Sequence, residues 1–273
     1  MKRSRPILRY HGGKWKLAPW IIQHFPPHRV YIEPFGGAAS VLLRKPRSYA
    51  EVYNDLDGEL VNLFRVARDR GDELQSILAL TPFARSEFEL SYVPTSDSLE
   101  QARRTVTRAF LGFGSKAHNR ATGFRNNSNR SGTTPAADWR NYPAALASTI
   151  ERLQGVVLEN RPAIDVMKQH DSPTTLHFVD PPYVSSTRDT GIDYRHEMTD
   201  DDHKLLALAL NKMEGSVVVS GYRSNIYDVL FSGWLRVDCL AHADGARARV
   251  ESLWLNAAAA ERIAQPSLLE QSA

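Results

Sequence analysis

Residues 30–37, VYIEPFGG, set the fold that the sequence predicts. Residues 30–34 form a short, apolar, β-prone segment that is followed directly by Phe35, Gly36 and Gly37. The next stretch, AASVLLRK (residues 38–45), opens with small residues and is expected to form a helix. A strand, a glycine turn and a helix are the first unit of a nucleotide-binding α/β fold.

The same alternation of strands and helices continues along the chain. A second strand is predicted over residues 49–53, where it ends in Asn54 and Asp55, and a helix follows over residues 58–70. Thr199 is expected to cap a later helix that has three aspartates in its first turn. Strands that alternate with helices predict a mostly parallel sheet covered on both faces. The remaining predicted strands cover residues 175–179, 216–220, 235–240 and 250–256.

A basic middle segment interrupts this alternation. Residues 101–137 contain no Asp or Glu, but many Arg, Asn and Gly residues and the aromatic residues Phe110, Phe113 and Phe124. We expect an inserted helical and loop region whose basic side chains contact nucleic-acid phosphates and base edges. The alternative is a solvated basic surface loop. The residues nominated as DNA contacts are Arg120, Arg125, Asn126 and Arg130.

The bulk properties exclude several classes of protein. The 273 residues carry 34 Lys and Arg against 31 Asp and Glu, so the net charge of +3 says little without its distribution. The single cysteine, Cys239, excludes an intramolecular disulfide and a thiolate zinc site. No stretch approaches the ~18 apolar residues that a membrane span needs. We therefore expect a cytoplasmic protein with no membrane partner. The cysteine count leaves a His/carboxylate metal site open.

The strongest local motif is Asp180-Pro181-Pro182-Tyr183, directly after the apolar strand. The Asp180 carboxylate and the Pro181 carbonyl are acceptors that can hold an amino group. The prolines stiffen the turn, and the Tyr183 ring offers a face on which an extruded base can stack. The alternative is a plain loop in which prolines end a strand.

Two further motifs suggest a bound cofactor. Asp55 follows the glycine turn by about 20 residues, the spacing at which a carboxylate accepts ribose hydroxyls in dinucleotide-binding folds. The full GxGxxG pattern is absent, which disfavours a pyrophosphate cofactor and favours S-adenosylmethionine (AdoMet). The segment Tyr10-His11-Gly12-Gly13-Lys14 lacks the spacing of a Walker A loop, and by itself it equally fits a flexible basic N-terminus.

Taken in order, YHGGK, PFGG, YND, the basic insert and DPPY resemble the DNA adenine methylase family, the Dam-like D12 class of N6-adenine methyltransferases, over residues 9–256. The motif order is similar to that of its α-group, and residues 193–203, 220–228 and 249–254 are similar to segments of bacteriophage-type members. The resemblance implies a Rossmann-like methyltransferase fold, AdoMet as methyl donor and double-stranded DNA as partner. The direct methyl transfer expected from these motifs implies no metal.

The resemblance also implies roles for the motif residues. Those expected at AdoMet are Tyr10, Lys14, Phe35, Gly36, Gly37, Asp55 and Asp180, and those expected to act on the adenine are Asp180, Pro181, Pro182 and Tyr183. Tyr10 departs from the tryptophan that is usual in the family. The insert departs from the pattern of members that read GATC, which leaves the recognition sequence open.

The resemblance divides the chain into a catalytic domain (residues 1–85 and 150–257), a DNA target-recognition insert (residues 86–149) and a flexible tail or short helix (residues 258–273). Methylation of cytosine N4, of RNA adenine or of a glutamine amide remains an alternative. So does a catalytically silent DNA-binding subunit. A monomer and a weak dimer both remain open.

Overall fold

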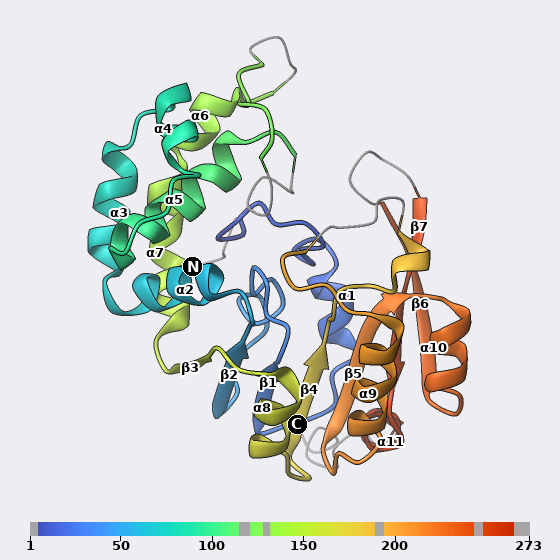
Figure 1. Cartoon of the computed structure of the whole chain (residues 1–273). Helices are drawn as coiled ribbons and strands as arrows, with labels where there is room; N and C mark the ends of the chain where they lie inside the picture. Colours follow the sequence, from blue (N-terminus) through green and yellow to red (C-terminus); the bar gives the residue numbers. More distant parts are fainter. Residues whose placement is uncertain (1–4, 115–120, 128–131, 189–193, 243–247, 265–273) are drawn as a thin grey trace. The chain divides into compact units, whose positions relative to one another are not determined.

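The computed structural model describes residues 5–114, 121–127, 132–188, 194–242 and 248–264 (Figure 1). The chain forms two compact units. The first comprises Met1–Trp15, Gly37–Arg44 and Asp57–Asn160, and the second comprises Lys16–Gly36, Lys45–Leu56 and Arg161–Ala273.

A mostly parallel sheet forms the centre of the second unit. Its strands follow the order β2-β1-β4-β5-β7-β6. Strands β2, β1, β4 and β5 run parallel, whereas β7 runs antiparallel to both β5 and β6. The predicted strands are all present, with shifts of up to two residues at their ends. Their bounds are β1 (Val30–Glu33), β2 (Ala50–Asn54), β4 (Thr175–Val179), β5 (Ser216–Tyr222), β6 (Leu235–His242) and β7 (Ala248–Leu255).

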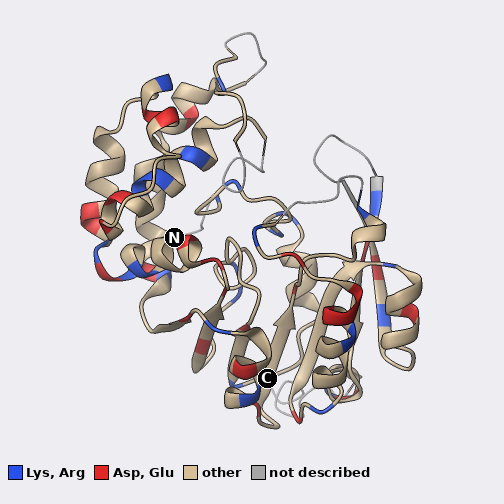
Figure 2. Ribbon diagram, in the orientation of Figure 1, with Lys and Arg blue, Asp and Glu red and all other residues tan. Residues whose placement is uncertain are grey.

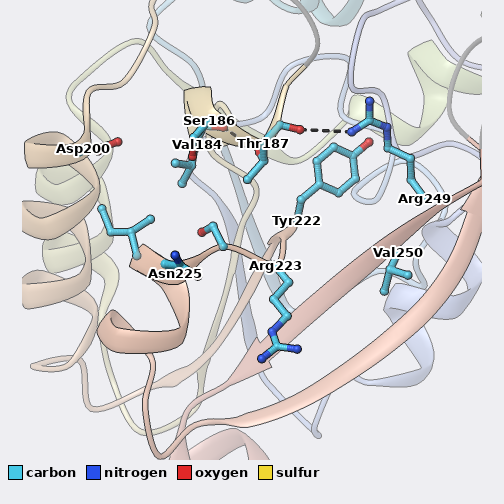
Figure 3. Close-up of a pocket in the computed structure, with 11 residues that line it drawn as sticks. Val184, Ser186, Thr187, Asp200, Tyr222, Arg223, Asn225, Arg249 and Val250 are labelled. Carbon is cyan, nitrogen blue, oxygen red and sulfur yellow. Dashed lines mark hydrogen bonds between the residues drawn. The ribbon is translucent and has the colours of Figure 1, made fainter.

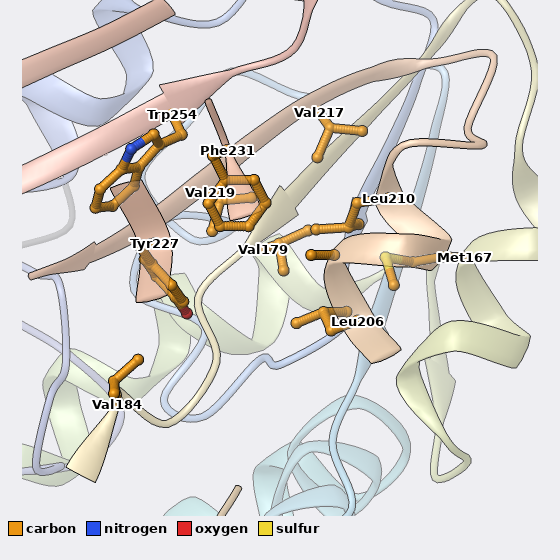
Figure 4. Packing of buried hydrophobic residues seen from close by; sticks show 11 residues of the cluster. Met167, Val179, Val184, Leu206, Leu210, Val217, Val219, Tyr227, Phe231 and Trp254 are labelled. Carbon is orange, nitrogen blue, oxygen red and sulfur yellow. The ribbon is translucent and has the colours of Figure 1, made fainter. Parts of the chain in front are cut away.

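Helices cover one face of this sheet through a buried apolar cluster (Figure 4). Val217 and Val219 of β5 point into it, together with Leu206 from α9 (Asp200–Leu210). Met167 from α8 (Ala163–His170) and Tyr227 from α10 (Asn225–Leu230) complete this layer. Side chains alternate along a strand, so Ser216 and Val218 must face the opposite side.

The opposite face carries α1 (Ala18–Gln23) and α11 (Ala257–Ala264). Phe25, just after α1, packs against Phe178 of β4 with ring centroids 5.6 Å apart. Arg262 of α11 donates to the Ser216 hydroxyl at 3.2 Å, and Ala259 is buried. The predicted α/β fold, with a mostly parallel sheet and helices on both faces, is thus confirmed.

The predicted helix over residues 38–45 is wrong. These residues form turns, and Gly37 and Ala39 adopt φ values of 48° and 51°, a left-handed conformation that an α-helix does not allow. Ala38, Val41 and Leu42 are all buried, so the stretch also lacks the polar face that a helix on the surface of a domain presents.

Thr199 caps α9 as predicted. Its side chain accepts from the Asp202 backbone N–H, and the Asp202 carboxylate accepts from the Thr199 N–H, which completes a capping box. His203, directly after the three aspartates of α9, is not exposed. It is buried, and its Nδ1 lies 3.1 Å from the Tyr227 hydroxyl.

The burial of His203 predicts a pH-dependent stability. Burial lowers the pKa of His203 below its ordinary value of 6.5, although Asp200 and Asp202 oppose the shift. The unfolded chain therefore binds a proton that the folded chain resists, so the free energy of unfolding should fall as the pH drops below 6.5. Urea unfolding between about pH 7.5 and about pH 5.5 should show this fall, to which His203 contributes at most about 1.4 kcal/mol per pH unit.

A His203→Gln variant is the matched control for that measurement. The free energy of unfolding of this variant should depend less on pH than that of the wild type. Some pH dependence should remain, because burial also lowers the pKa of His177 in β4. Equal pH dependence in the variant and the wild type would contradict the assignment.

The first unit is helical. Its long helices α2, α3, α5 and α7 pack against one another, and α4 and α6 pack beside α5. Asp97 caps α5 by accepting from the Glu100 N–H at 2.8 Å. Helices α5 and α6, and most of α4 and α7, lie in the predicted insert (residues 86–149), while α2 and α3 of the same unit precede it. The bounds are α2 (Gly58–Asp69), α3 (Gly71–Leu80), α4 (Arg85–Leu90), α5 (Ser98–Leu111), α6 (Pro135–Arg140), α7 (Tyr142–Leu153) and the short strand β3 (Val156–Glu159).

The functional division at residues 86 and 149 stays a prediction, because the compact units are defined by contacts and not by role. In the predicted tail, residues up to Ala264 belong to α11, and residues 265–273 lie outside the described part. None of the described helices has the length and apolarity to cross a membrane.

Candidate active site

Three predicted site segments leave the same edge of the sheet in the second unit. β1 lies between β2 and β4, and the chain moves to opposite sides of β1 when it enters these two strands. The boundary between β1 and β4 is therefore a topological switch point, where open α/β sheets bind ligands beyond the carboxyl ends of their strands. Gly36 follows β1, Asp55 follows β2 and Asp180 follows β4.

Asn54 ties the glycine turn to the end of β2. The Gly36 N–H donates to the Asn54 carbonyl at 2.8 Å, and Asn54 Nδ2 donates to the Pro34 carbonyl at 2.9 Å. The same amide donates to the Arg161 carbonyl and accepts from the Arg161 N–H. Sequence reasoning gave weight to Asp55 and overlooked Asn54. Asn54 could have been identified from the sequence, because it is a polar amide at the last position of an apolar strand, where a buried amide needs hydrogen-bond partners.

Gly36 lies against a neighbouring aromatic ring. A Cβ atom at Gly36 would lie 2.1 Å from Cε2 of the buried Tyr53. Phe35, beside it, packs on the cluster of Figure 4. The pairing of PFGG with YND thus has a packing cause: the glycine makes room for the tyrosine of the next strand.

The N-terminal motif and Gly37 meet within the first unit. Residues 10–13 form a turn in which the Gly13 N–H donates to the Tyr10 carbonyl at 3.2 Å. The buried Lys14 folds back so that its Nζ donates to the Gly12 carbonyl at 2.8 Å. A Cβ atom at Gly37 would lie 2.9 Å from Tyr10 Cε1. The alternative of a flexible N-terminus does not describe this turn.

Asp180 is fixed by the neighbouring strand. The hydroxyl of the buried Ser220 in β5 donates a short hydrogen bond to Asp180 Oδ1. Because β4 and β5 are parallel neighbours, this bond links the DPPY segment to the sheet. A carboxylate held in this way keeps further lone pairs for other donors.

Tyr183 is buried, which differs from the open stacking face expected from the sequence. Its hydroxyl donates to Glu251 Oε2 at 2.7 Å, and its ring packs edge-on against Tyr222 with centroids 4.7 Å apart. Burial, with the nearby Glu251 and Asp180 carboxylates, raises the pKa of Tyr183 well above its ordinary value. Glu251 and Tyr222 were not among the predicted site residues, since they lie on β7 and at the end of β5, remote from DPPY in sequence.

Removal of the Glu251 carboxylate should loosen Tyr183. Glu251→Ala leaves a buried hydroxyl without this acceptor, so the free energy of unfolding should drop by about 1–3 kcal/mol in urea unfolding. Glu251→Gln retains an acceptor oxygen and should cost less. Equal losses in the two variants would show that the Tyr183 bond is not the cause.

A pocket of about 780 Å³ lies beside the DPPY segment, within the second unit (Figure 3). Val184, which follows Tyr183 directly, lines it together with Thr187 from the short helix η1 (Ser185–Thr187). Tyr222 and Arg223 at the end of β5, and Arg249 of β7, form other parts of its wall.

Three arginines of the basic segment (residues 101–137) are paired with acidic side chains. Arg103, Arg104 and Arg108 all form ion pairs with glutamates of the same unit, and Figure 2 shows acidic residues close to the basic ones on these helices. The acid-free stretch therefore does not present these three charges to DNA. These ion pairs could not be inferred from residues 101–137 alone, because the partners, Glu59, Glu87 and Glu100, all precede residue 101.

The nominated DNA contacts are described in part. Arg120 and Arg130 lie outside the described residues. Arg125 Nη1 lies 3.6 Å from Asp138 Oδ2, and it donates to the Phe110 carbonyl at 3.4 Å. Asn126 is exposed. Arg125 thus has a structural role in this unit.

Within the described residues, no three His, Cys, Asp or Glu side chains are grouped so that they could hold a metal ion.

Comparisons with known proteins point to one family. Residues 10–239 match the family described as D12 class N6 adenine-specific DNA methyltransferase. DNA adenine methylase of Serratia marcescens is 37% identical over 73 residues, which is 27% of this chain and 27% of that protein. DNA adenine methylase of Escherichia coli K12 is 36% identical over 73 residues, or 27% and 26% of the two chains. The matches thus span about a quarter of the length of these relatives. The family match covers most of this chain, and the chain belongs to the D12 class of N6 adenine-specific DNA methyltransferases.

Proposed function

We propose that this protein transfers a methyl group from AdoMet to the exocyclic N6 of an adenine extruded from double-stranded DNA. The observation that carries the proposal is the position of Asp180. It follows a central parallel strand at the topological switch point, its carboxylate is anchored by Ser220, and it is the first residue of a DPPY segment. Membership of the D12 class supports adenine in DNA as the acceptor.

The residues around the glycine turn fit AdoMet by their chemistry. AdoMet brings a methyl group on a sulfonium, a ribose with two hydroxyls and an adenine, and no phosphate. The Asp55 carboxylate at the end of β2 suits the ribose hydroxyls, and the turn at Phe35 and Gly36 leaves its backbone beside the same edge. We assign Tyr10, Lys14 and Gly37 to the same binding function, as the family resemblance implies.

In this proposal the DPPY segment holds the amino group that reacts. Asp180 and the Pro181 carbonyl accept hydrogen bonds from N6, so that its lone pair points at the methyl carbon. The N6 lone pair forms the new C–N bond as the S–CH₃ bond breaks, and one N6 proton passes to water afterwards. Positioning and electrostatic support of the charge that develops on N6 supply the rate enhancement.

Pro182 keeps the turn stiff, and Tyr183 supplies the aromatic surface for the extruded base. Because the Tyr183 ring is buried against Tyr222, stacking requires the base to enter beside this aromatic pair, or the pair to open.

The experiment that tests the function is chemical analysis of the product. DNA incubated with the protein and AdoMet is digested to nucleosides and analysed by mass spectrometry. N6-methyl-2′-deoxyadenosine as the product is expected, whereas N4-methyl-2′-deoxycytidine would refute the assignment of the base. A titration with AdoMet addresses the alternative of a silent DNA-binding subunit, which would bind DNA and not the methyl donor.

We further propose that residues 86–149 contribute to DNA recognition, with Arg120, Asn126 and Arg130 as contacts. The exposure of Asn126 and the pairing of its side chain type with adenine edges support the nomination of this residue. Arg125 is a weaker candidate than the sequence implied, because its side chain is already engaged with Asp138 and Phe110.

A further inference from the structure

The pocket beside Tyr183 is rich in hydrogen-bond donors that the proposed methyl transfer does not use. Two guanidinium groups, Arg223 and Arg249, line it, together with the hydroxyl of Ser186 and the amide of Asn225 (Figure 3). Asp200, an exposed carboxylate, is the acidic residue of the wall. The net positive charge and the donor surplus suit an anion with several acceptor oxygens.

Arg249 is held in place by its surroundings. Its Nη1 donates to the Thr187 carbonyl at 3.2 Å, and its guanidinium carbon lies 5.2 Å from the centroid of the Tyr222 ring. The same Tyr222 ring contacts Tyr183 edge-on. The cation is therefore pre-positioned one aromatic ring away from the DPPY tyrosine, and little side-chain entropy remains to be lost when it binds an anion.

Arg223, unlike Arg249, is exposed and can exchange its partner for an anion. Its side chain is 62% exposed, and its Nε lies 3.0 Å from Asp228 Oδ2. An ion pair this exposed contributes little, so a phosphate can replace Asp228 at small cost. Figure 3 shows Arg249 beside Tyr222 and Arg223 pointing away from that ring, so the two cations do not converge on one point.

We infer that this pocket binds the DNA backbone next to the extruded deoxyadenosine, with Arg249 and Arg223 on separate phosphodiester groups of one strand. The inference rests on the proposed function, since it is the target nucleotide at DPPY that brings the backbone to this pocket. Because the two guanidinium groups are separated, they suit two phosphates of one strand better than a single phosphate bound by both. These contacts are independent of base sequence and set the position of the strand.

The test measures binding to a short mixed-sequence DNA duplex across a range of salt concentrations. Each lost phosphate contact should reduce the slope of log K against log salt by about 0.9 in magnitude. The Arg223→Ala/Arg249→Ala double variant should therefore bind about tenfold more weakly at low salt, with a slope smaller by up to about 1.8. The Arg223→Lys/Arg249→Lys variant retains the charges and should keep most of the slope.

Arg236→Ala is the matched control. Arg236 lies on β6 of the same unit, pairs with Asp228 and Asp238, and does not line the pocket. Its loss should leave both affinity and slope close to those of the wild type. An AdoMet titration of each variant verifies that the protein is folded.

The outcomes separate this inference from the proposed function. A wild-type slope in the double alanine variant, or an equal loss in Arg236→Ala, overturns the phosphate pocket even if the wild type methylates adenine. A failure of the wild type to form N6-methyl-2′-deoxyadenosine in DNA overturns the proposed function and is measured by the nucleoside analysis, not by these slopes.

Discussion

The Asp180→Ala variant should lose methyl transfer, while its binding of AdoMet should stay at least partly measurable. The carboxylate is the group proposed to hold N6 in line with the methyl carbon, and a substitution that removes it should lower kcat by about 10³-fold or more. Single-turnover assays with labelled AdoMet measure the chemical step, and an equilibrium titration measures AdoMet affinity. Methylation close to the wild-type rate would remove Asp180 from the mechanism.

Ser220→Ala provides a graded control for this result. The serine touches the Asp180 carboxylate and does not itself contact the amine in the proposed arrangement. Loss of this one hydrogen bond should lower kcat by about tenfold, because a hydrogen bond to a charged group is worth about 1.5–3 kcal/mol and only part of it bears on positioning. An effect as large as that of Asp180→Ala would mean that the serine, and not the carboxylate alone, meets the substrate.

The strands were predictable from the sequence because each is short, apolar and followed by a distinctive turn. Residues 175–179 lie between two neighbouring parallel strands and are buried throughout, so their run of apolar and β-branched residues has one interpretation. The failed helix over residues 38–45 shows the limit of that approach. Its composition suits a buried helix as well as a buried set of turns, and the positive φ values of Gly37 and Ala39 decide the matter.

The site was predictable where its residues are consecutive. PFGG and DPPY each follow a strand, YND forms the end of β2 and the residue after it, and parallel topology brings these strand ends to one edge. The supporting residues were not predictable, because they come from distant positions: Ser220 reaches Asp180 across 40 residues, and Glu251 reaches Tyr183 across 68. These contacts depend on which strands are neighbours in the sheet. No local sequence pattern encodes that strand order.

The basic segment illustrates a different limit. A window without acidic residues looks like a surface for nucleic acid, but helices bring charges together from outside the window. Arg108 is paired with Glu59, 49 residues earlier in the chain. Net charge in a sequence segment therefore predicts a binding surface only after ion pairs within the fold are subtracted.

Gly36→Ala should destabilise the second unit far more than a glycine substitution at an open position. The new Cβ would lie 2.1 Å from Tyr53 Cε2 and 2.4 Å from Cδ2, and the buried ring has no solvent into which it can turn. The ring or the turn must shift, at an expected cost of about 3 kcal/mol in the free energy of unfolding. The turn also carries the Gly36 hydrogen bond to Asn54, so AdoMet affinity should fall with it.

Gly58→Ala is the matched control, because a Cβ there would meet no atom closer than 3.8 Å, at the first position of α2. It should leave stability unchanged or slightly raised. A double-mutant cycle then identifies the obstacle. If the Tyr53 ring causes the loss, Gly36→Ala and Tyr53→Ala combined should destabilise by clearly less than the sum of the single variants, because the new methyl group fills space that the ring has vacated. Strict additivity of the two urea-unfolding losses would place the cause in the backbone of the turn instead, and the link between PFGG and YND would then not be one of packing.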